Sequence, residues 1–149
     1  MKVKDCMCND VCSVKPDTKI WEVAKLMSQN HIGSVAVTDS DDGICGIVTD
    51  RDIILRTICC DKDAKNTPVS EVMTTNVCTC MEDDEVSKAE VTMSTNQIRR
   101  LPVCNCNDKL VGILTLGNLA QNTNQIGKEQ VCKTVENICE CKPNEKNSD

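Results

Sequence analysis

The sequence predicts an α+β fold in which one strand–helix–strand–strand–helix unit occurs twice and is followed by a further helix. The main observation is an internal repeat with a constant spacing of 66 residues, which separates Met7 from Met73 and Thr49 from Thr115. The second observation is that short β-branched runs alternate with segments of helical periodicity inside each copy. Two copies of one unit favour a pseudo-twofold pair with related clefts between its halves.

The first copy shows this order of elements clearly. Apolar residues at helical spacing follow Pro16 and Asp17, and a polar turn separates two β-branched runs. In order, the expected elements are an extended run over 11–14, a helix from Ile20, strands over 34–38 and 44–49, and a helix over 50–58. The last helix is expected to bury Ile53, Ile54 and Ile58.

The second copy follows the same plan and carries the segments outside the repeat. The expected elements are an extended run over 77–80, a helix over 86–96, strands over 101–104 and 110–115, and a helix over 116–121. Short helical segments over 3–7 and 69–73 lead into the copies, a helix is expected over 126–138, and residues 143–149 are expected to be disordered. The resulting division is repeat 1 over 1–60, a linker over 61–68, repeat 2 over 69–122, and a C-terminal helix and tail over 123–149.

Composition limits both the core and the class of partner. The 149 residues suffice for one core, which the two copies are expected to share, and Trp21 is the only aromatic residue. Aliphatic residues, Met and Cys must therefore fill that core. A net charge of −6 and the lack of aromatic platforms argue against a nucleic acid polymer as partner. No signal peptide or membrane-length apolar run is present, so a soluble, cytoplasmic protein without a membrane partner is expected.

Thirteen cysteines stand out in a chain without a secretory signal. Their odd number favours free thiols in a reducing cytosol. Cys-x-Cys pairs occur at Cys6/Cys8, Cys78/Cys80, Cys104/Cys106 and Cys139/Cys141. Zinc sites usually use wider Cys-x₂₋₄-Cys spacing, so small packing residues are favoured over a metal site, and no metal ligands are assigned. A thiol-based metal or redox protein remains the alternative.

The most informative motif is a strand that ends in Gly-x-x-Thr-x-x-Asp or Asn. It occurs as residues 46–52 and again as residues 112–118. A threonine at a helix start is most often only an N-cap, which is the alternative for one copy alone. Two occurrences at equivalent places favour a functional site, in which the hydroxyl faces a phosphate and the acid or amide faces a ribose diol. No nucleophile accompanies the single histidine, His31, so no catalytic residue is assigned and no enzyme is expected.

Over residues 1–122 the chain resembles a tandem pair of CBS domains, the cystathionine-β-synthase-type module, of the stand-alone bacterial type. The resemblance is carried by both Gly-x-x-Thr motifs, by the lead-in over 69–74 and by the Arg-Arg-Leu-Pro-Val segment over 99–103. It implies pseudo-symmetric βαββα repeats in contact through their sheets, and a regulatory role. It also implies binding of AMP, ADP, ATP or S-adenosylmethionine, no other cofactor, a homodimer and an unknown regulated protein.

The resemblance also implies two composite clefts. Cleft A would combine Thr49, Arg51 and Asp52 with Val77, Cys78, Ile98, Arg99, Arg100 and Pro102. Cleft B would combine Thr115 and Asn118 with Val11, Cys12, Ile32, Gly33 and Ser34. The backbone at Cys12 and Cys78 would meet the adenine edge, and Ile32 and Ile98 would cover a ring face.

The two clefts are expected to differ in affinity. Cleft A offers an acid for the ribose and two arginines for phosphate, whereas cleft B offers neutral Asn118, with Gly33 and Ser34 in place of the arginines. Charge-assisted hydrogen bonds are about twice as strong as neutral ones. Cleft A is therefore expected to bind phosphorylated adenosine first, and Asp52→Ala is expected to remove more binding than Asn118→Ala.

Overall fold

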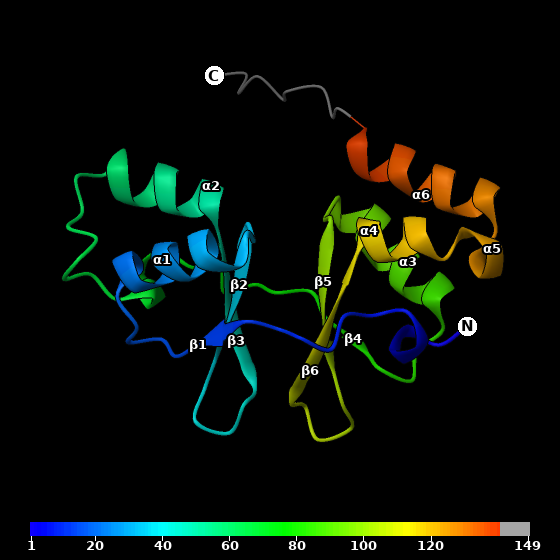
Figure 1. The fold of residues 1–149 in the computed structure, drawn as a ribbon, viewed down its shortest axis with the longest axis horizontal. Helices are drawn as coiled ribbons and strands as arrows, with labels where there is room; N and C mark the ends of the chain where they lie inside the picture. Colours follow the sequence, from blue (N-terminus) through cyan, green and yellow to red (C-terminus); the bar gives the residue numbers. More distant parts are fainter. Residues whose placement is uncertain (141–149) are drawn as a thin grey trace, which may run out of the picture.

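The computed structural model describes residues 1–140, which form two similar halves side by side (Figure 1). Each half holds a three-stranded mixed sheet, in the order β1-β2-β3 and β4-β5-β6. The strands are β1 (Ser13–Val14), β2 (Ser34–Thr38), β3 (Ile44–Thr49), β4 (Cys80–Met81), β5 (Arg100–Cys104) and β6 (Leu110–Thr115). The predicted α+β fold of two pseudo-symmetric repeats is confirmed.

The helices also follow the predicted order, with differences at their ends. They are η1 (Val3–Asp5), α1 (Ile20–Asn30), α2 (Asp50–Ile53), η2 (Ile54–Ile58), η3 (Val69–Glu71), α3 (Val86–Asn96), α4 (Leu116–Gln121), α5 (Thr123–Ile126) and α6 (Lys128–Cys139). The single helix predicted over 50–58 changes from α to π geometry at Ile54. The helix predicted over 126–138 begins later, because Gly127 has a φ of 108° and separates α5 from α6. The predicted tail over 143–149 lies outside the described residues.

The extended runs predicted at the start of each repeat are shorter than expected. β1 and β4 contain two residues each, whereas four were predicted. Both pair in parallel with the middle strand of their own sheet, as Ser13 does with Ala36 and Cys80 does with Val103. The residues before them connect the repeats instead, since Cys8 forms a bridge with Ile113 and Thr74 one with Ile47.

The expectation of one shared core is wrong, because each repeat has its own. Repeat 1 buries a cluster around Ile20, Val23, Val35, Val37 and Val48, and repeat 2 buries one around Val86, Met93, Leu101, Val103 and Leu114. The lead-in segments are exchanged between these cores. Val3 and Cys6 belong to the core of repeat 2, whereas Val69 and Val72 belong to the core of repeat 1. The repeats are therefore interlocked although their cores are separate.

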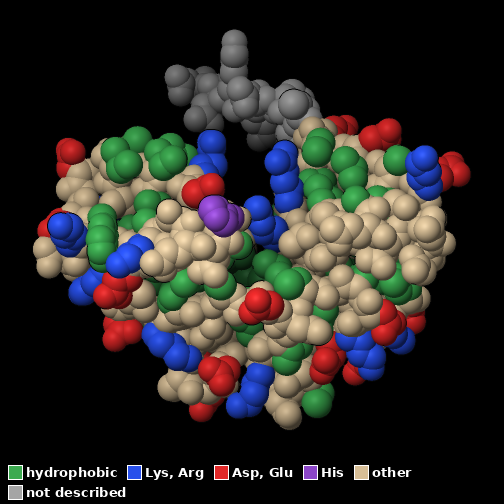
Figure 2. Space-filling model, in the orientation of Figure 1, with side chains coloured by type: hydrophobic (Ala, Val, Ile, Leu, Met, Phe, Trp, Pro, Cys, Tyr) green, Lys and Arg blue, Asp and Glu red, His purple; other side chains and the backbone are tan. Residues whose placement is uncertain are grey.

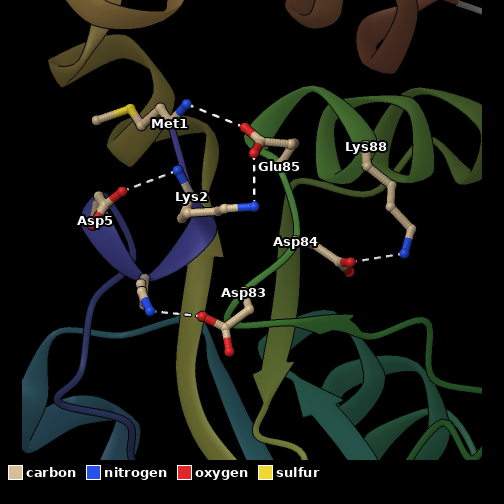
Figure 3. A network of polar contacts seen from close by, with 8 residues as sticks. Met1, Lys2, Asp5, Asp83, Asp84, Glu85 and Lys88 are labelled. Atoms are coloured by element: carbon tan, nitrogen blue, oxygen red, sulfur yellow. Dashed lines mark hydrogen bonds and ion pairs between the residues drawn. The ribbon is translucent and has the colours of Figure 1, made fainter.

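Backbone hydrogen bonds fix each exchanged lead-in in the same way. The Val3 N–H donates to the Asp84 carbonyl at 2.9 Å, and the Val69 N–H donates to the Thr18 carbonyl at 2.7 Å. Figure 3 shows the ion pairs around the first lead-in, including Lys2 to Glu85 at 2.7 Å and Lys4 to Asp83 at 2.6 Å. These side chains are exposed, so the pairs contribute little and the buried valines carry the stability of the exchange.

The glycine of each Gly-x-x-Thr motif is explained by this exchange. A Cβ added to Gly46 would lie 2.4 Å from the Met73 sulfur, and one added to Gly112 would lie 2.5 Å from the Met7 sulfur. Each methionine comes from the lead-in that precedes the other repeat. Gly112 has in addition the Cys8 carbonyl oxygen at 3.0 Å from the added Cβ. Only glycine leaves room for the crossing segment at these positions.

The apolar faces of the two last repeat helices differ, which corrects one expectation. Ile54 and Ile58 were predicted to be buried but are 52% and 68% exposed, and Leu55 beside them is also exposed. Figure 2 shows apolar side chains gathered on the surface of this half of the molecule. Leu119, in contrast, is fully buried in a core that includes Val131 and Ile138 of α6. The C-terminal helix therefore covers repeat 2, and no segment of residues 1–140 covers the end of η2 in this way.

Helix α6 is also joined to α3 by a buried polar contact. The Glu90 carboxylate accepts hydrogen bonds from the Thr134 hydroxyl at 3.0 Å and from the Gln130 side-chain amide. Glu90 is buried, and these two donors satisfy both of its oxygens. Its counterpart in repeat 1 is Ala24, which needs no such partner.

Within the part of the chain that the structure describes, no helix is both long and apolar enough to cross a bilayer.

Candidate functional site

The two motif threonines occupy equivalent places at the start of α2 and α4. The Thr49 hydroxyl accepts a hydrogen bond from the Asp52 N–H at 3.1 Å, and the Asp52 carboxylate accepts one from the Thr49 N–H at 3.0 Å. Thr115 and Asn118 make the same reciprocal pair, at 3.1 and 2.9 Å. Both motifs are thus capping boxes, so each threonine is an N-cap whatever else it contacts.

Behind the second of these helix starts lies a cavity of about 360 Å³ between the repeats. All seven residues predicted for cleft B line it: Val11, Cys12, Ile32, Gly33, Ser34, Thr115 and Asn118. The remaining lining residues are Cys8, Asp10, His31, Ala36, Arg100 and Ile113. A volume of this size, with apolar walls and a few polar groups, is typical of a small-molecule site.

Arg100 lies in cleft B, whereas the sequence assigned it to cleft A. It pairs with Thr115 across the antiparallel strands β5 and β6, and directly opposed residues place their side chains on the same face of a sheet. The premise that cleft B has no arginine is therefore wrong. The Arg100 side chain reaches the first repeat, because a guanidinium nitrogen lies 3.6 Å from a Cβ added to Gly33.

The residues predicted for cleft A do not share one of the larger cavities found among residues 1–140. Thr49 and Asp52 lie together, but Asp52 also faces the Arg56 guanidinium at 3.8 Å. Arg56 in turn donates a hydrogen bond to the Val72 carbonyl at 3.0 Å. Arg51 and Arg99 are exposed, Val77, Cys78 and Ile98 are half-buried, and Pro102 is buried within β5.

Sequence reasoning missed the part of cleft B that comes from the exchanged lead-in. Cys8 and Ile113 are joined by reciprocal backbone hydrogen bonds of 2.9 Å, which place residues 8–12 beside β6. His31 reaches the cavity because it ends α1 with a left-handed φ of 53°. Gln97 ends α3 in the same left-handed conformation. The repeat spacing, which matches His31 with Gln97, was therefore the one available signal that His31 occupies a defined position at a helix end.

Only a few charges face cleft B. Asp10 and Arg100 are the charged lining residues, joined by His31, which is purple in Figure 2 beside the hollow between the halves. The blue side chains in the same view show that basic groups gather at the upper rim of this hollow. The cavity is therefore close to neutral and carries one guanidinium.

The cysteines of the described residues are free thiols, and none joins a disulfide. Burial raises the pKa of the Cys6 and Cys104 thiols, and burial beside the Asp84 carboxylate raises the pKa of Cys80 to about 12. These thiols stay protonated at neutral pH and act as small apolar residues. Over residues 1–140, no group of three or more His, Cys, Asp or Glu side chains is arranged to hold a metal ion. The burial of Cys6, Cys80 and Cys104 supports the interpretation of these three as packing residues.

Comparison with known proteins decides the family. The sequence model of the CBS domain matches residues 3–57 and again residues 69–122. The chain belongs to the CBS domain family. CBS domain-containing protein YhcV of Bacillus subtilis (strain 168) is 41% identical to it over 137 residues, which is 91% of this chain and 94% of the relative. No catalytic family is indicated by these matches.

Two solved CBS structures that resemble the chain contain adenosine compounds. One is CBSX2 in complex with AMP, which is 25% identical, has a TM-score of 0.73, and matches 85% of this chain and 98% of that one. The other is the CBS domain pair of protein MJ0100 in complex with 5′-methylthioadenosine and S-adenosyl-L-methionine. It is 27% identical, has a TM-score of 0.73, and matches 83% of this chain and 96% of that one.

Proposed function

We propose that this CBS domain pair is a regulatory module that senses an adenosine-containing ligand in cleft B. The observation that carries the proposal is the 360 Å³ cavity, which both repeats line and which holds Thr115 and Asn118 side by side. Adenosine compounds bound to CBS pairs of the same fold, AMP in one and S-adenosyl-L-methionine in another, support this ligand class.

The lining suits the parts of an adenosine compound. Ile32, Ala36 and Ile113 provide apolar surface for a purine ring. Asn118 directs its side-chain oxygen to Thr115, so its amide nitrogen is the group left to donate to a ribose hydroxyl. Arg100 supplies the cation for an anionic group beyond the ribose.

Cleft A takes the second place in this proposal, the reverse of the order expected from the sequence. Thr49 and Asp52 would contact the ligand there, together with Arg51, Arg99 and the half-buried residues Val77, Cys78 and Ile98. Arg56 lies against Asp52, so a ribose diol would have to compete with an existing ion pair. Cleft B has no such competitor at Asn118, which is why we expect it to fill first.

The experiment is isothermal titration of the reduced protein with adenosine, AMP, ADP, ATP and S-adenosylmethionine. We expect Asn118→Ala to weaken the binding of the preferred compound about tenfold, because the variant loses the hydrogen bond from the Asn118 amide to the ribose. Asp52→Ala serves as the matched control in cleft A and should change the same affinity less. The absence of binding by all five compounds would refute the function, and a larger loss for Asp52→Ala would reverse the order of the clefts.

The regulated partner and the homodimer belong to the same proposal. Ile54, Leu55 and Ile58 form an exposed apolar patch at the end of α2 and η2, and such patches usually mark contact surfaces. A second copy meeting this patch would form a closed, symmetric pair. The free thiols suit a reducing cytoplasm as its location.

A further inference from the structure

An acid from repeat 1 and a base from repeat 2 converge at Gly33, on the wall of cleft B. A Cβ added to Gly33 would lie 3.2 Å from an Asp50 carboxylate oxygen and 3.6 Å from an Arg100 guanidinium nitrogen. Arg100 lines the cavity, whereas Asp50 is not one of the lining residues and lies beside the cavity, next to Gly33. The Asp50 backbone is fixed there, because its N–H donates to the Gly33 carbonyl at 3.0 Å.

The pseudo-symmetric position does not repeat this arrangement. The 66-residue spacing matches Gly33 with Arg99, Asp50 with Leu116, and Arg100 with Ser34. The Leu116 N–H donates to the Arg99 carbonyl at 3.2 Å, so the backbone is equivalent, but the acid is absent and the arginine stands at the position of Gly33. The neighbouring acid and base are therefore a feature of one cleft, added to a common backbone by two side chains, Asp50 and Arg100.

The Arg100 guanidinium lies near the Asp50 carboxylate, on either side of the Gly33 Cα, without forming a direct ion pair. The ion pairs within 4.0 Å over the described chain do not include Arg100. One Asp50 oxygen is engaged, since it accepts a hydrogen bond from the Arg51 N–H at 2.8 Å, and the other oxygen points toward Gly33. The guanidinium can therefore turn to a ligand while it still feels the Asp50 charge.

We propose that Asp50 is a specificity-determining residue of cleft B, which limits the ligand to an adenosine compound with a single phosphate. This inference rests on the proposed function and adds to it a choice among adenosine compounds. Arg100 pairs with one phosphate, whereas Asp50 and Asp10 repel the further charges of a di- or triphosphate. AMP is thus favoured over ATP by repulsion, and adenosine is unaffected by either charge.

The test is a titration of adenosine, AMP and ATP into the wild-type chain and three variants at low ionic strength. Asp50→Asn should tighten ATP binding about threefold to tenfold, tighten AMP binding less, and leave adenosine unchanged. Arg100→Gln should weaken AMP binding about tenfold and again leave adenosine unchanged. Lys128→Gln is the control, an exposed lysine at the start of α6 that does not line the cavity, and should change none of the three.

The outcomes separate this inference from the proposed function. If the wild-type chain binds adenosine and AMP but Asp50→Asn shifts AMP and ATP equally or not at all, the role of Asp50 is refuted and the function stands. If Lys128→Gln reproduces Arg100→Gln, the loss reflects net charge alone and the placement of the phosphate is refuted. If the wild-type chain binds none of the three, both proposals fail. Asp50→Ser is a second neutral variant, and the thermal unfolding of both variants is recorded. Unfolding temperatures close to that of the wild-type chain would exclude a general loss of structure as the cause of the changed binding.

Discussion

The two repeats share a backbone and differ in what surrounds it. Both end their last strand in a threonine that caps a helix, and both bury valines from the lead-in of the other repeat. Repeat 1 then continues into a π-helix with Ile54 and Ile58 exposed, whereas in repeat 2 the chain turns at Gly127 and α6 covers the core. A pair of nearly identical units thus presents one open face and one closed face.

The cores differ in chemistry as well. The buried thiols Cys6, Cys80 and Cys104 lie in repeat 2 or its contacts, and their counterparts by the repeat spacing are Val72, Val14 and Thr38. Repeat 1 therefore packs without buried cysteines at these positions. The comparison shows that a duplicated fold fixes where side chains point, while single substitutions decide which copy responds to charge, pH or a partner.

The motif glycines offer the largest effect. Gly112→Ala should destabilise the protein by about 3 kcal/mol and Gly46→Ala by about 1–2 kcal/mol, because overpacking a tight contact costs 1–3 kcal/mol and more where backbone cannot move. Both variants meet a methionine sulfur, but Gly112→Ala also meets the Cys8 carbonyl. Urea unfolding measures the difference. Gly117→Ala, whose Cβ would meet only the Thr115 hydroxyl at 3.5 Å, is the control and should not destabilise. Equal losses of stability in Gly46→Ala and Gly112→Ala would show that the Cys8 carbonyl adds nothing to the clash at Gly112.

The open face of repeat 1 is tested by charge at Ile58. Ile58→Asp should weaken a homodimer more than tenfold, since an isoleucine side chain contributes about 1.5–3 kcal/mol when buried. Asn124→Asp changes the equivalent exposed position of repeat 2 and should leave the dimer intact. Sedimentation velocity reports the result as a species near 16.4 kDa or near twice that mass. A wild-type chain that sediments as a monomer at micromolar concentration would rule the dimer out.

The two caps should differ by a smaller amount. Thr49→Val removes the bond that the hydroxyl accepts, whereas Thr115→Val also removes the bond that it donates to the Asn118 side-chain oxygen at 2.9 Å. Cap replacement usually costs about 1 kcal/mol, so we expect about 1 kcal/mol at Thr49 and up to about 2 kcal/mol at Thr115. Chemical denaturation of both variants provides the comparison. A larger loss at Thr49 would show that the additional bond contributes nothing.

The buried thiols make stability depend on alkaline pH. The Cys80 pKa is raised from 9.0 to about 12 in the folded chain, so its contribution is complete below pH 9 and is lost as the pH rises from 9 towards 12. At pH 9.5 the loss should be less than about 1 kcal/mol. Cys80→Val introduces the size of its counterpart Val14 and should flatten the stability profile above pH 9. The exposed Cys106→Val is the control, and an unchanged slope in Cys80→Val would exclude this thiol as the cause.

Much of the fold follows from local patterns in the sequence. The β2 and β3 strands, α3 and α4 depend on periodicity and on neighbours in the chain, and each was predicted with correct bounds. The capping role of Thr49 and Thr115, which the structure shows, was only the alternative to the functional site that the sequence favoured. Seven of the thirteen residues that line cleft B were expected there from the family resemblance, which supplied the composite arrangement of the clefts.

The remaining features depend on tertiary arrangement that periodicity does not encode. Apolar spacing identified the face of the helix that carries Ile54 and Ile58, but it cannot say whether another segment covers that face. Arg100 lines cleft B although it was assigned to cleft A, because its long side chain extends from repeat 2 to Gly33 of repeat 1. The exchange of Val3 and Val69 between repeats leaves no local signal, since either lead-in has the same sequence character in either place.

The exchanged lead-ins also set an order in which the chain can fold. The core of repeat 1 is complete only when Val72 has been synthesised, and Val3 must wait for the strands of repeat 2, about 80 residues later. Meanwhile Val3 and Met7 match the positions that Val69 and Met73 finally take in repeat 1. The nascent chain can therefore close on its own lead-in, with a shorter loop and a smaller entropy loss, before it reaches the exchanged state.

Escape from that early arrangement requires the lead-in to leave one repeat and enter the other. We expect a slow refolding phase that reports this crossing, visible in the fluorescence of Trp21. The backbone N–H of Trp21 donates to the Ala64 carbonyl, ahead of the second lead-in. Val3→Ala removes apolar contacts of the first lead-in in either repeat, so fewer molecules should be held in the early arrangement. The amplitude of the fast phase should therefore grow and that of the slow phase should shrink. A single refolding phase in the wild-type chain would show that the exchange forms directly. The exchange of lead-in segments thus holds the two repeats together, and the same exchange creates a kinetic trap in folding.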